Sequence, residues 1–494
     1  MKEKIYRGRH PLRVFDVVKA LAFVGDLSMG QPTNHSLRTA WLAVRLAHVA
    51  ELDAAAQAAV CEAALLRWSG CTANAGDFSD VFGDDIAVRV AMLEGRPEAI
   101  RPVADMANMG VVLRPLAQIH CEVSAEVGRL LALSSATETT LRHILEAWDG
   151  SGQPAQLAGD AVPATVSVVS IAGDIEVLGR TYGTEQALAR IRERGDKRYP
   201  ASLAALAARH AADWLAELEG SSPATLDMAL STPRMALTTP ADLIADVIDL
   251  KLPWMTGFSR AVAATAAQAF GRLSSDKAAQ ERVYHAGLLH GLGRASVPIQ
   301  IWNMTTHLPA SAWETLRLVP YWTSRAGQWA GPLGEAATLA SFAYERIDGS
   351  GYFRGARDQS LSTEARVLAA SVAWVAMRSP RPWRAAMPAD AAAQQLREDV
   401  RAGRLCGEAV DALVSGGAGI ARPAAERTET RHLLSPRESD VLRAISRGAT
   451  NKEAARELNL SPSTVATHVE SVFRKLGCTT RAAATLKASA IGLL

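Results

Sequence analysis

Apolar residues recur at helical spacing along most of the chain. Between residues 11 and 218, for example, Leu37, Ala40 and Trp41 place apolar side chains on one face of a helix. Alternating β-branched runs are rare and aromatic residues make up only 5% of the sequence, so signals for strands are nearly absent. The one stretch that favours a strand, residues 162–173, lies among helical segments and is predicted to be a buried helix. The pattern therefore predicts an all-α protein.

Helix-breaking residues divide this pattern into parts. Glycine, serine and proline gather at residues 219–240, and a second stretch rich in glycine, proline and charge covers residues 415–432. Both stretches are predicted to be linkers. We therefore expect three folded parts, which are a first helical half over residues 1–218, a second half over residues 241–414 and a small terminal domain over residues 433–494.

The terminal domain has the signals of four short helices. Ser435 with Glu438, and Thr450 with Glu453, each form a capping box at a helix start. The remaining signals are a turn at Asn459 and Leu460, a third helix from Ser461 and Pro462 to Leu476, a stop at Gly477 and a cap at Thr479 or Thr480. Two short helices joined by a tight turn are typical of a helix-turn-helix.

This terminal segment resembles the LuxR-type (NarL/FixJ-type) helix-turn-helix family over its whole length. The residues that carry the resemblance are Leu434 to Glu438, Val441, Leu442, Gly448, Asn451 to Glu453, Ala455, Leu458, Ser461 to Val465, His468, Val469, Lys475 to Gly477 and Arg481. The resemblance implies that the third helix, residues 461–476, enters the major groove of double-stranded DNA. It also implies that the last helix, residues 481–494, supports dimerisation.

The resemblance also assigns candidate DNA contacts. The base-reading positions hold Ala466, Thr467 and Glu470, at which members of the family often carry lysine. A methyl group at 466 or 467 is expected to meet thymine, and Glu470 either accepts from cytosine N4 or faces solvent. The other candidates are Lys452, Arg474 and Lys475 for phosphates, and Thr464, His468 and Ser471 along the same helix.

Charge supports DNA binding at this end of the chain. The whole chain has a formal net charge of only +2, but ten Lys and Arg face five Asp and Glu from Arg431 to the end. The terminal segment is therefore at +5 and the remainder at −3, which confines phosphate attraction to one part.

The remaining composition points to the cytoplasm. The five cysteines are scattered and include no CxxC pair, which is typical of reduced thiols. No run of about 18 apolar residues is present, and the basic start lacks a cleavage-type site, so neither a membrane span nor a signal peptide is expected.

The two large halves resemble each other. Residues 64–71 and 287–294 match at an offset of 223, and residues 146–153 and 345–352 match at an offset of 199. The first copy is therefore longer by about 24 residues, inserted between roughly 71 and 119.

These landmarks resemble the HD-GYP branch of the HD superfamily. The resemblance implies an all-helical bundle whose His and Asp residues hold two or three metal ions, usually iron or manganese, and hydrolyse cyclic di-GMP. Such metals create hydroxide near neutral pH and neutralise the phosphodiester. The carrying turns are Asp149 to Gly152 and Asp348 to Tyr352, with Glu146 and Glu345 before them.

The chain departs from that pattern at most metal-ligand positions. In the order opening His, His-Asp pair, single His, His pair and late Asp, the first copy has His35, Arg67-Trp68, His120, Ile144-Leu145 and Gly173, and the second has Phe258, His290-Gly291, Val319, Ala343-Tyr344 and Val372. We therefore expect a lost catalytic centre, with no metal or other cofactor, and a protein that is not an enzyme.

Residues left in the inherited pocket are the candidate ligand contacts. Arg67 can replace the charge of a metal and bind an anion, and Trp68 can stack on a ring. The alternative role for both is to fill the space that the metal centre would take. The candidates are His35, Arg67, Trp68, His120, His290, Tyr344 and Trp322.

These features together predict a cytoplasmic, homodimeric transcriptional regulator with a helical body. Its expected partners are promoter DNA, a small-molecule effector bound by the body, and RNA polymerase. Two alternatives stay open. One is a working metal-dependent cyclic di-GMP phosphodiesterase fused to a DNA-binding domain, and the other is a body that serves only as a dimerisation or docking platform.

Overall fold

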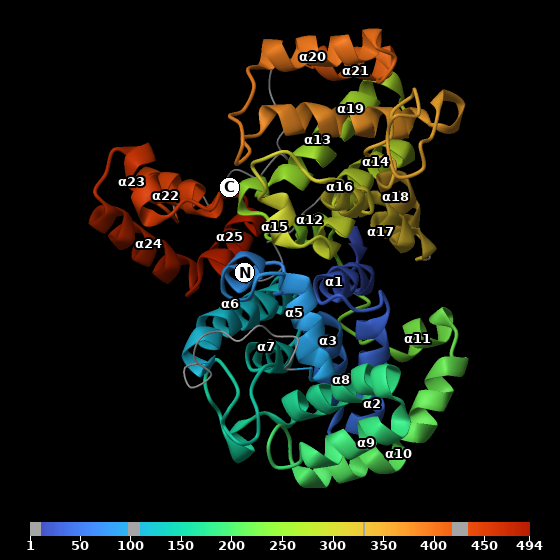
Figure 1. The fold of residues 1–494 in the computed structure, drawn as a ribbon, viewed down its shortest axis with the longest axis vertical. Coiled ribbons are helices and arrows are strands. Elements are labelled where there is room, and N and C mark those ends of the chain that lie inside the picture. Colours follow the sequence, from blue (N-terminus) through green and yellow to red (C-terminus); the bar gives the residue numbers. More distant parts are fainter. Residues whose placement is uncertain (1–10, 97–108, 330, 417–432) are drawn as a thin grey trace. The chain divides into compact units, whose positions relative to one another are not determined.

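The computed structural model describes residues 11–96, 109–329, 331–416 and 433–494, and the regular secondary structure of these residues is almost all helix (Figure 1). The all-α prediction is confirmed. The strands assigned among the described residues are two of three residues each, β1 (Pro11–Arg13) and β2 (Thr238–Pro240), which pair with each other. The chain forms two compact units, made mainly of residues 11–239 and 240–477.

The first unit is a layered bundle around the buried helices α2, α3 and α8. Residues 164–173 of the stretch 162–173 belong to α8, so the predicted buried helix is confirmed, and Asp53 caps α3 by accepting from Ala56 N. The segment predicted to be a linker, residues 219–240, holds α11 and β2. The helices are α1 (Val14–Ser28), α2 (His35–Val49), α3 (Ala54–Leu66), α4 (Ala75–Phe82), α5 (Asp85–Glu94), α6 (Met109–Leu130), α7 (Ser135–Arg142), α8 (Ala164–Tyr182), α9 (Thr184–Glu193), α10 (Ala201–Gly220) and α11 (Pro223–Ala229).

The second unit contains a bundle of the same kind, in which α13 packs against α14 and α19. Two more helices, α20 and α21, lie beside α19 (Figure 1). The helices of this bundle are α12 (Asp242–Asp249), α13 (Phe258–Leu273), α14 (Lys277–Leu289), α15 (Ile299–Trp302), α16 (Ala310–Arg317), α17 (Val319–Arg325), α18 (Pro332–Ala340), α19 (Thr363–Arg378), α20 (Ala389–Arg401) and α21 (Gly407–Val414).

The two halves repeat the same helix starts at the offsets seen in the sequence. Helices α2 and α13 begin 223 residues apart, as do α3 and α14, and α8 and α19 begin 199 apart. Buried hydrogen bonds repeat as well. Asp26 accepts from the backbone N–H and the hydroxyl of Ser36, and Asp249 does the same for Ser259. Matching contacts between matching side chains indicate one fold used twice.

The glycine-rich turns after α7 and α18 are organised by one glutamate each. Glu146 accepts from the backbone N–H groups of Ala155 and Leu157, at 2.7 and 3.0 Å. Glu345 accepts from two backbone N–H groups as well, at 2.8 and 2.9 Å. Both carboxylates are buried, so these turns retain their polar frame in both halves.

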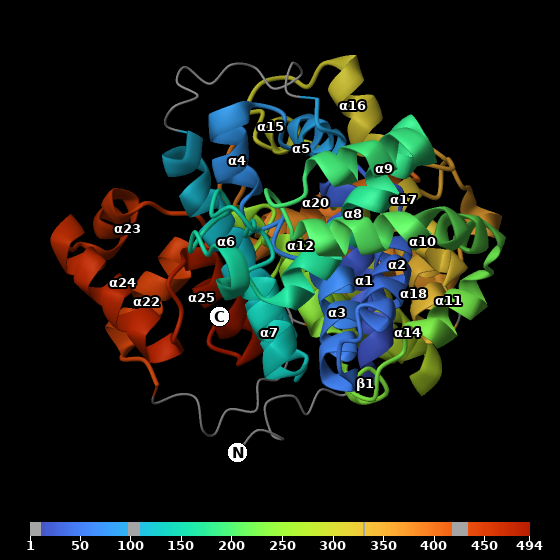
Figure 2. The same ribbon diagram turned by 90° about the horizontal axis from the view of Figure 1, so that it is seen from below.

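The terminal domain forms the four predicted helices, α22 (Pro436–Ser446), α23 (Asn451–Leu458), α24 (Pro462–Leu476) and α25 (Arg481–Ala490). Both predicted capping boxes are present, and Asn459 ends α23 in the left-handed conformation. Thr480 rather than Thr479 accepts from Ala483 N at the start of α25. Figure 2 shows α22, α23 and α24 packed together.

Within the described ranges, no helix combines the length and the apolar character that crossing a membrane requires.

We predict that the turn-organising glutamates stabilise the fold. In Glu345→Gln one carboxylate oxygen becomes an NH2 group facing a backbone N–H, which leaves a buried donor without an acceptor and should cost about 1–3 kcal/mol of unfolding free energy. Urea unfolding of the full chain measures this cost. Glu335→Gln is the control, because the Glu335 side chain is 67% exposed and the change should cost less than about 1 kcal/mol. Equal costs would contradict the prediction.

Candidate functional site

The first-half site is built around the buried side chain of Arg67. Because α3 ends at Leu66, Arg67 turns into the bundle, where it is only 4% exposed. Its Nη2 lies 2.6 Å from His35 Nε2 and 3.2 Å from Thr39 Oγ1. Arginine has only donors, so Nε2 of His35 accepts and the imidazole proton is on Nδ1. Nδ1 in turn donates to Glu176, which completes a buried chain from carboxylate through imidazole to guanidinium.

The charges along this chain follow from burial. Burial lowers the pKa of His35, although Glu176 opposes the shift, and burial lowers the pKa of Arg67 to about 10. Burial alone would raise the pKa of Glu176, but the hydrogen bond from His35 and the charges of Arg180 and Arg38 bring it down to about 2. At neutral pH Glu176 is therefore an anion, His35 a neutral imidazole and Arg67 a cation.

The residues around Arg67 do not fit a metal centre of the HD type. At Gly173, which stands at the late Asp position, an added Cβ would lie 2.0 Å from Arg67 Nη1, so the guanidinium occupies that space. The neighbouring Asp174 binds Arg194 at 2.6 Å and Tyr199 at 3.3 Å. In the part of the chain that the structure describes, no three His, Cys, Asp or Glu side chains converge as metal ligands would.

Trp68 and His120 complete the first-half site. The guanidinium of Arg67 lies 4.6 Å from the Trp68 ring centre, and the Trp68 and His120 rings are 5.9 Å apart. His120 Nδ1 lies 3.6 Å from Cys71 Sγ. The structure thus brings together all four candidates of this half, His35, Arg67, Trp68 and His120, in one buried cluster.

The second half repeats the arginine–histidine contact from a different position. His290 is the counterpart of Arg67, and Arg294 lies four residues later. Arg294 Nη2 is 2.5 Å from His290 Nε2, and its Nη1 is 3.3 Å from Asp249 Oδ1. His290 Nδ1 donates to the Gly287 carbonyl at 2.6 Å, which fixes the same tautomer as in the first half. Sequence reasoning found His290 but missed Arg294, although an arginine one helical turn away was a usable signal.

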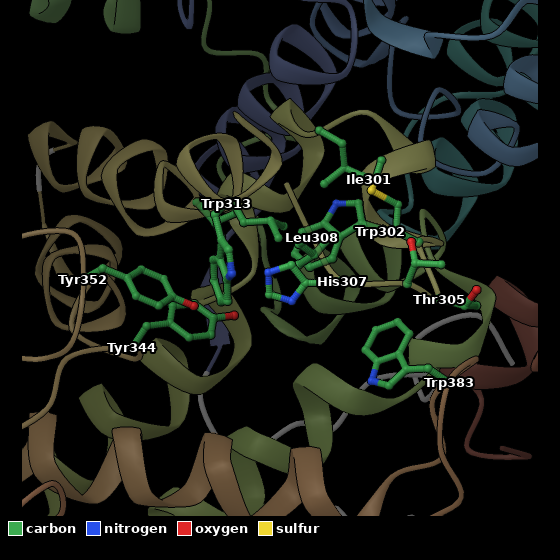
Figure 3. A pocket seen from close by; sticks show the side chains of 13 residues that line it. Ile301, Trp302, Thr305, His307, Leu308, Trp313, Tyr344, Tyr352 and Trp383 are labelled. Atoms are coloured by element: carbon green, nitrogen blue, oxygen red, sulfur yellow. The ribbon is translucent and has the colours of Figure 1, made fainter. Parts of the chain in front are cut away.

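An aromatic cavity of about 570 Å³ opens in the second half (Figure 3). Tyr344 and Tyr352 stack at one end with ring centres 5.3 Å apart, and Trp383 lies at the other end. Of the candidates, Tyr344 lines the cavity, whereas Trp322 does not and packs against Tyr321. The lining residues are Ile301, Trp302, Met304, Thr305, Thr306, His307, Leu308, Trp313, Leu316, Val319, Tyr344, Tyr352 and Trp383.

This cavity borders the position of the arginine–histidine pair. The His290 ring is 6.4 Å from the ring of Tyr344, and Val319 is the counterpart of His120. Sequence reasoning did not identify His307 or Tyr352 as cavity residues. The second half is crowded with tryptophans, Trp302, Trp313 and Trp383 among them, and the sequence predicts most of these in the core and some along an apolar ligand pocket. Trp302, His307 and Trp313 belong to a segment with no ligand position of the HD-GYP pattern, so only the crowding of tryptophans marked it.

The candidate DNA contacts lie on the outer side of α24 and on α23. Four apolar side chains of α24 are buried against the rest of the domain, namely Val465, Val469, Val472 and Leu476. Lys452, Thr464, Thr467, Glu470, Arg474 and Lys475 are exposed, and Ala466, His468 and Ser471 are half-buried.

Several of these candidates make hydrogen bonds inside the domain, and two of them, Ser471 and Lys475, connect α24 to α22. Ser471 donates to Glu438 at 2.7 Å and Lys475 donates to the same carboxylate at 2.6 Å. Thr464 contacts the capping hydroxyl of Ser461 at 2.8 Å, and Thr467 donates to the carbonyl of Ser463 at 3.2 Å. The methyl group of Thr467 and the side chains of Ala466 and Glu470 make none of these internal hydrogen bonds.

Comparison with protein families identifies two domains in the chain. Residues 242–405 match the HD domain, and residues 432–488 match the luxR family of bacterial regulatory proteins. The chain thus carries an HD domain and a C-terminal LuxR-type helix-turn-helix domain, as the two resemblances predicted.

Individual relatives extend these matches. The 3'3'-cGAMP-specific phosphodiesterase 3 of Vibrio cholerae is 24% identical over 76% of this chain and 88% of its own length. The crystal structure of a cyclic GMP-AMP specific phosphodiesterase from V. cholerae superposes with a TM-score of 0.57 at 21% identity, over 83% of this chain and 98% of that chain, so the two share a fold. The transcriptional activator RamA of Corynebacterium glutamicum is 48% identical over 12% of this chain and 22% of its own length.

The buried His120 predicts a pH dependence of stability. Burial, assisted by the charge of Arg89, lowers the pKa of this imidazole from 6.5 to about 4. Below pH 6.5 the His120 imidazole therefore binds a proton in the unfolded chain but remains neutral in the folded chain. The contribution of His120 to stability is complete above pH 6.5 and falls by ~1.4 kcal/mol per pH unit toward pH 4.

His120→Gln should remove that part of the slope of unfolding free energy against pH, measured by urea unfolding between pH 4 and 7. His48→Gln is the control, since His48 is an exposed histidine of the same half. A slope unchanged by His120→Gln would overturn the assignment.

Proposed function

Because the chain joins an HD domain to a LuxR-type helix-turn-helix domain, we propose that it is a homodimeric transcriptional regulator whose body binds a small molecule without hydrolysing it. One observation carries the second part of the proposal. In both halves a buried arginine donates to Nε2 of the pocket histidine, Arg67 to His35 and Arg294 to His290.

That contact opposes metal catalysis for a direct reason. A histidine ligand offers a metal the lone pair of one ring nitrogen while the other nitrogen donates a proton to a neighbour. Here Nδ1 donates to Glu176 or to the Gly287 carbonyl, and Nε2 already accepts from a guanidinium. A metal at Nε2 would have to displace a buried cation, and two positive charges in a low-dielectric interior repel strongly.

The relatives suggest the class of ligand. The V. cholerae relative and the V. cholerae crystal structure both carry the name of a phosphodiesterase specific for 3'3'-cGAMP or cyclic GMP-AMP. We propose a cyclic dinucleotide of this class as the effector, with arginines supplying the positive charge that metals supply in HD-type phosphodiesterases. Hydrolysis of the same compound is the second candidate function, since the named activity of these relatives favours it.

The proposed output is a change in DNA binding. The terminal segment is at +5, and the body is expected to hold two such domains in one dimer. Effector binding to one arrangement of the dimer would favour one spacing of the two recognition helices. The half-sites of the operator would then match that spacing or miss it.

Full-length protein incubated with 3'3'-cGAMP tests the proposal. Calorimetry should detect binding, and chromatography of the same mixture with added Mn²⁺ or Fe²⁺ should show the compound unconsumed. The affinity for operator fragments selected from a random pool should change when the compound is added. Metal-dependent formation of a linear dinucleotide would overturn the proposal of binding without hydrolysis and establish hydrolysis, the second candidate function.

DNA binding gives a separate prediction. Lys452→Ala should weaken binding to all fragments alike and reduce the slope of log affinity against log salt by about 1, because one phosphate contact is lost. Fluorescence anisotropy across salt concentrations measures both. Arg443→Ala is the control, since Arg443 pairs with Asp440 on α22 and is no candidate contact. Identical salt slopes for the two variants would remove Lys452 from the interface.

A further inference from the structure

Arg381 is half-buried, and its guanidinium lacks an anionic partner among the described residues. It follows α19 in a tight turn, in which Arg381 and Arg384 exchange backbone hydrogen bonds of 2.8 and 3.1 Å. Its Nη1 is buried and makes no hydrogen bond, and no carboxylate of the described residues forms an ion pair with it. The neighbouring arginines differ, because Arg294 binds Asp249 and Arg384 donates to backbone carbonyls.

The charge around Arg381 is unbalanced. Burial, followed by repulsion from Arg294 and Arg384, lowers the pKa of Arg381 to about 10. The nearby carboxylate of Asp249 already accepts from Arg294 and Ser259. A half-buried cation with one buried, unpartnered nitrogen and no counter-charge is unfavourable, so this site is suited to receiving an anion.

Aromatic contacts connect this cation to the cavity through intervening rings. The Arg381 guanidinium lies 4.7 Å from the ring centres of both Trp254 and Phe258. Trp254 meets Trp383 edge-on at 5.7 Å, and Trp383 lines the cavity. On the other side Phe258 lies 5.7 Å from His290, which neighbours the cavity residue Tyr344.

The cavity itself suits a flat, uncharged group. No Lys, Arg, Asp or Glu is among the lining residues, and the cavity's rings come from Trp302, His307, Trp313, Tyr344, Tyr352 and Trp383. Indole and phenol rings stack on the face of any nucleobase, so this contact does not require base-specific hydrogen bonds. Trp302 Nε1 is a buried donor without an acceptor in the described part of the chain, and a base can supply one.

We propose that the second half binds an anionic nucleotide with its base in this aromatic cavity and its phosphate on Arg381. The inference deepens the proposed function, on which it rests, by assigning effector binding to the second half and the anionic contact to a residue outside the HD-GYP pattern. In the first half the guanidinium of Arg67 is already connected through His35 to Glu176, so protein groups balance its charge.

The test compares phosphorylated and unphosphorylated probes on the full-length protein. Tryptophan fluorescence titrations would use 3'3'-cGAMP, AMP and GMP, together with adenosine and guanosine. In Arg381→Met, which retains the apolar contact with Trp254 and Phe258, the phosphate-bearing probes should bind at least about tenfold more weakly, as loss of one charge-assisted hydrogen bond implies. The nucleosides should bind as they do to the unchanged protein.

Two further measurements separate a binding role from a structural one. The thermal unfolding midpoint of ligand-free Arg381→Met should be unchanged or raised, because an unpaired cation is removed. Arg397→Gln, at an exposed arginine on α20, should alter neither binding nor stability.

The outcomes distinguish this inference from the proposed function. Equal weakening of nucleotides and nucleosides in Arg381→Met, or no weakening of either, would overturn the role of Arg381. Retained binding of 3'3'-cGAMP in that variant would then leave the proposed effector standing. Binding of AMP or GMP that depends on Arg381, without binding of 3'3'-cGAMP, would support the site and overturn the cyclic dinucleotide. Absence of binding by every probe would overturn both.

Discussion

A buried guanidinium held against a neutral histidine is the interaction on which the body of this protein depends. Arginine remains charged in nearly all protein environments, so its burial must be balanced by dipoles and an anion. In the first half the balance runs through His35 to Glu176, and in the second it runs through His290 and Asp249. Each contact fixes the imidazole tautomer and uses the nitrogen through which a metal would bind.

The two halves use the same fold with different chemistry. The aspartate–serine contacts before α2 and α13, and the glutamates that organise the later turns, are equivalent in both. Around Arg67 the charges are internally compensated and the site is closed. Around Arg294 and Arg381 positive charge is in excess and an aromatic cavity opens beside it. The asymmetry of charge, rather than of backbone, separates a structural half from a binding one in the proposed function.

Sequence alone predicted the helical class, the repeat and the terminal helices because each has a local signal. Caps at Ser435 and Thr450 need only neighbouring residues, and the offsets of 223 and 199 survive in the helix starts. It also brought His35, Arg67, Trp68 and His120 together, since the HD-GYP pattern relates them. Arg294, Arg381 and the cavity tryptophans lay outside that pattern. Their contacts, and the absence of an ion pair at Arg381 within the described part of the chain, are set by how the bundle packs and have no local signal in the sequence.

The two arginines stand at different positions in the repeat. Arg67 replaces the first residue of the His-Asp pair, whereas Arg294 lies four residues after the counterpart of that residue. The two copies therefore hold a guanidinium against a neutral imidazole from positions that do not correspond.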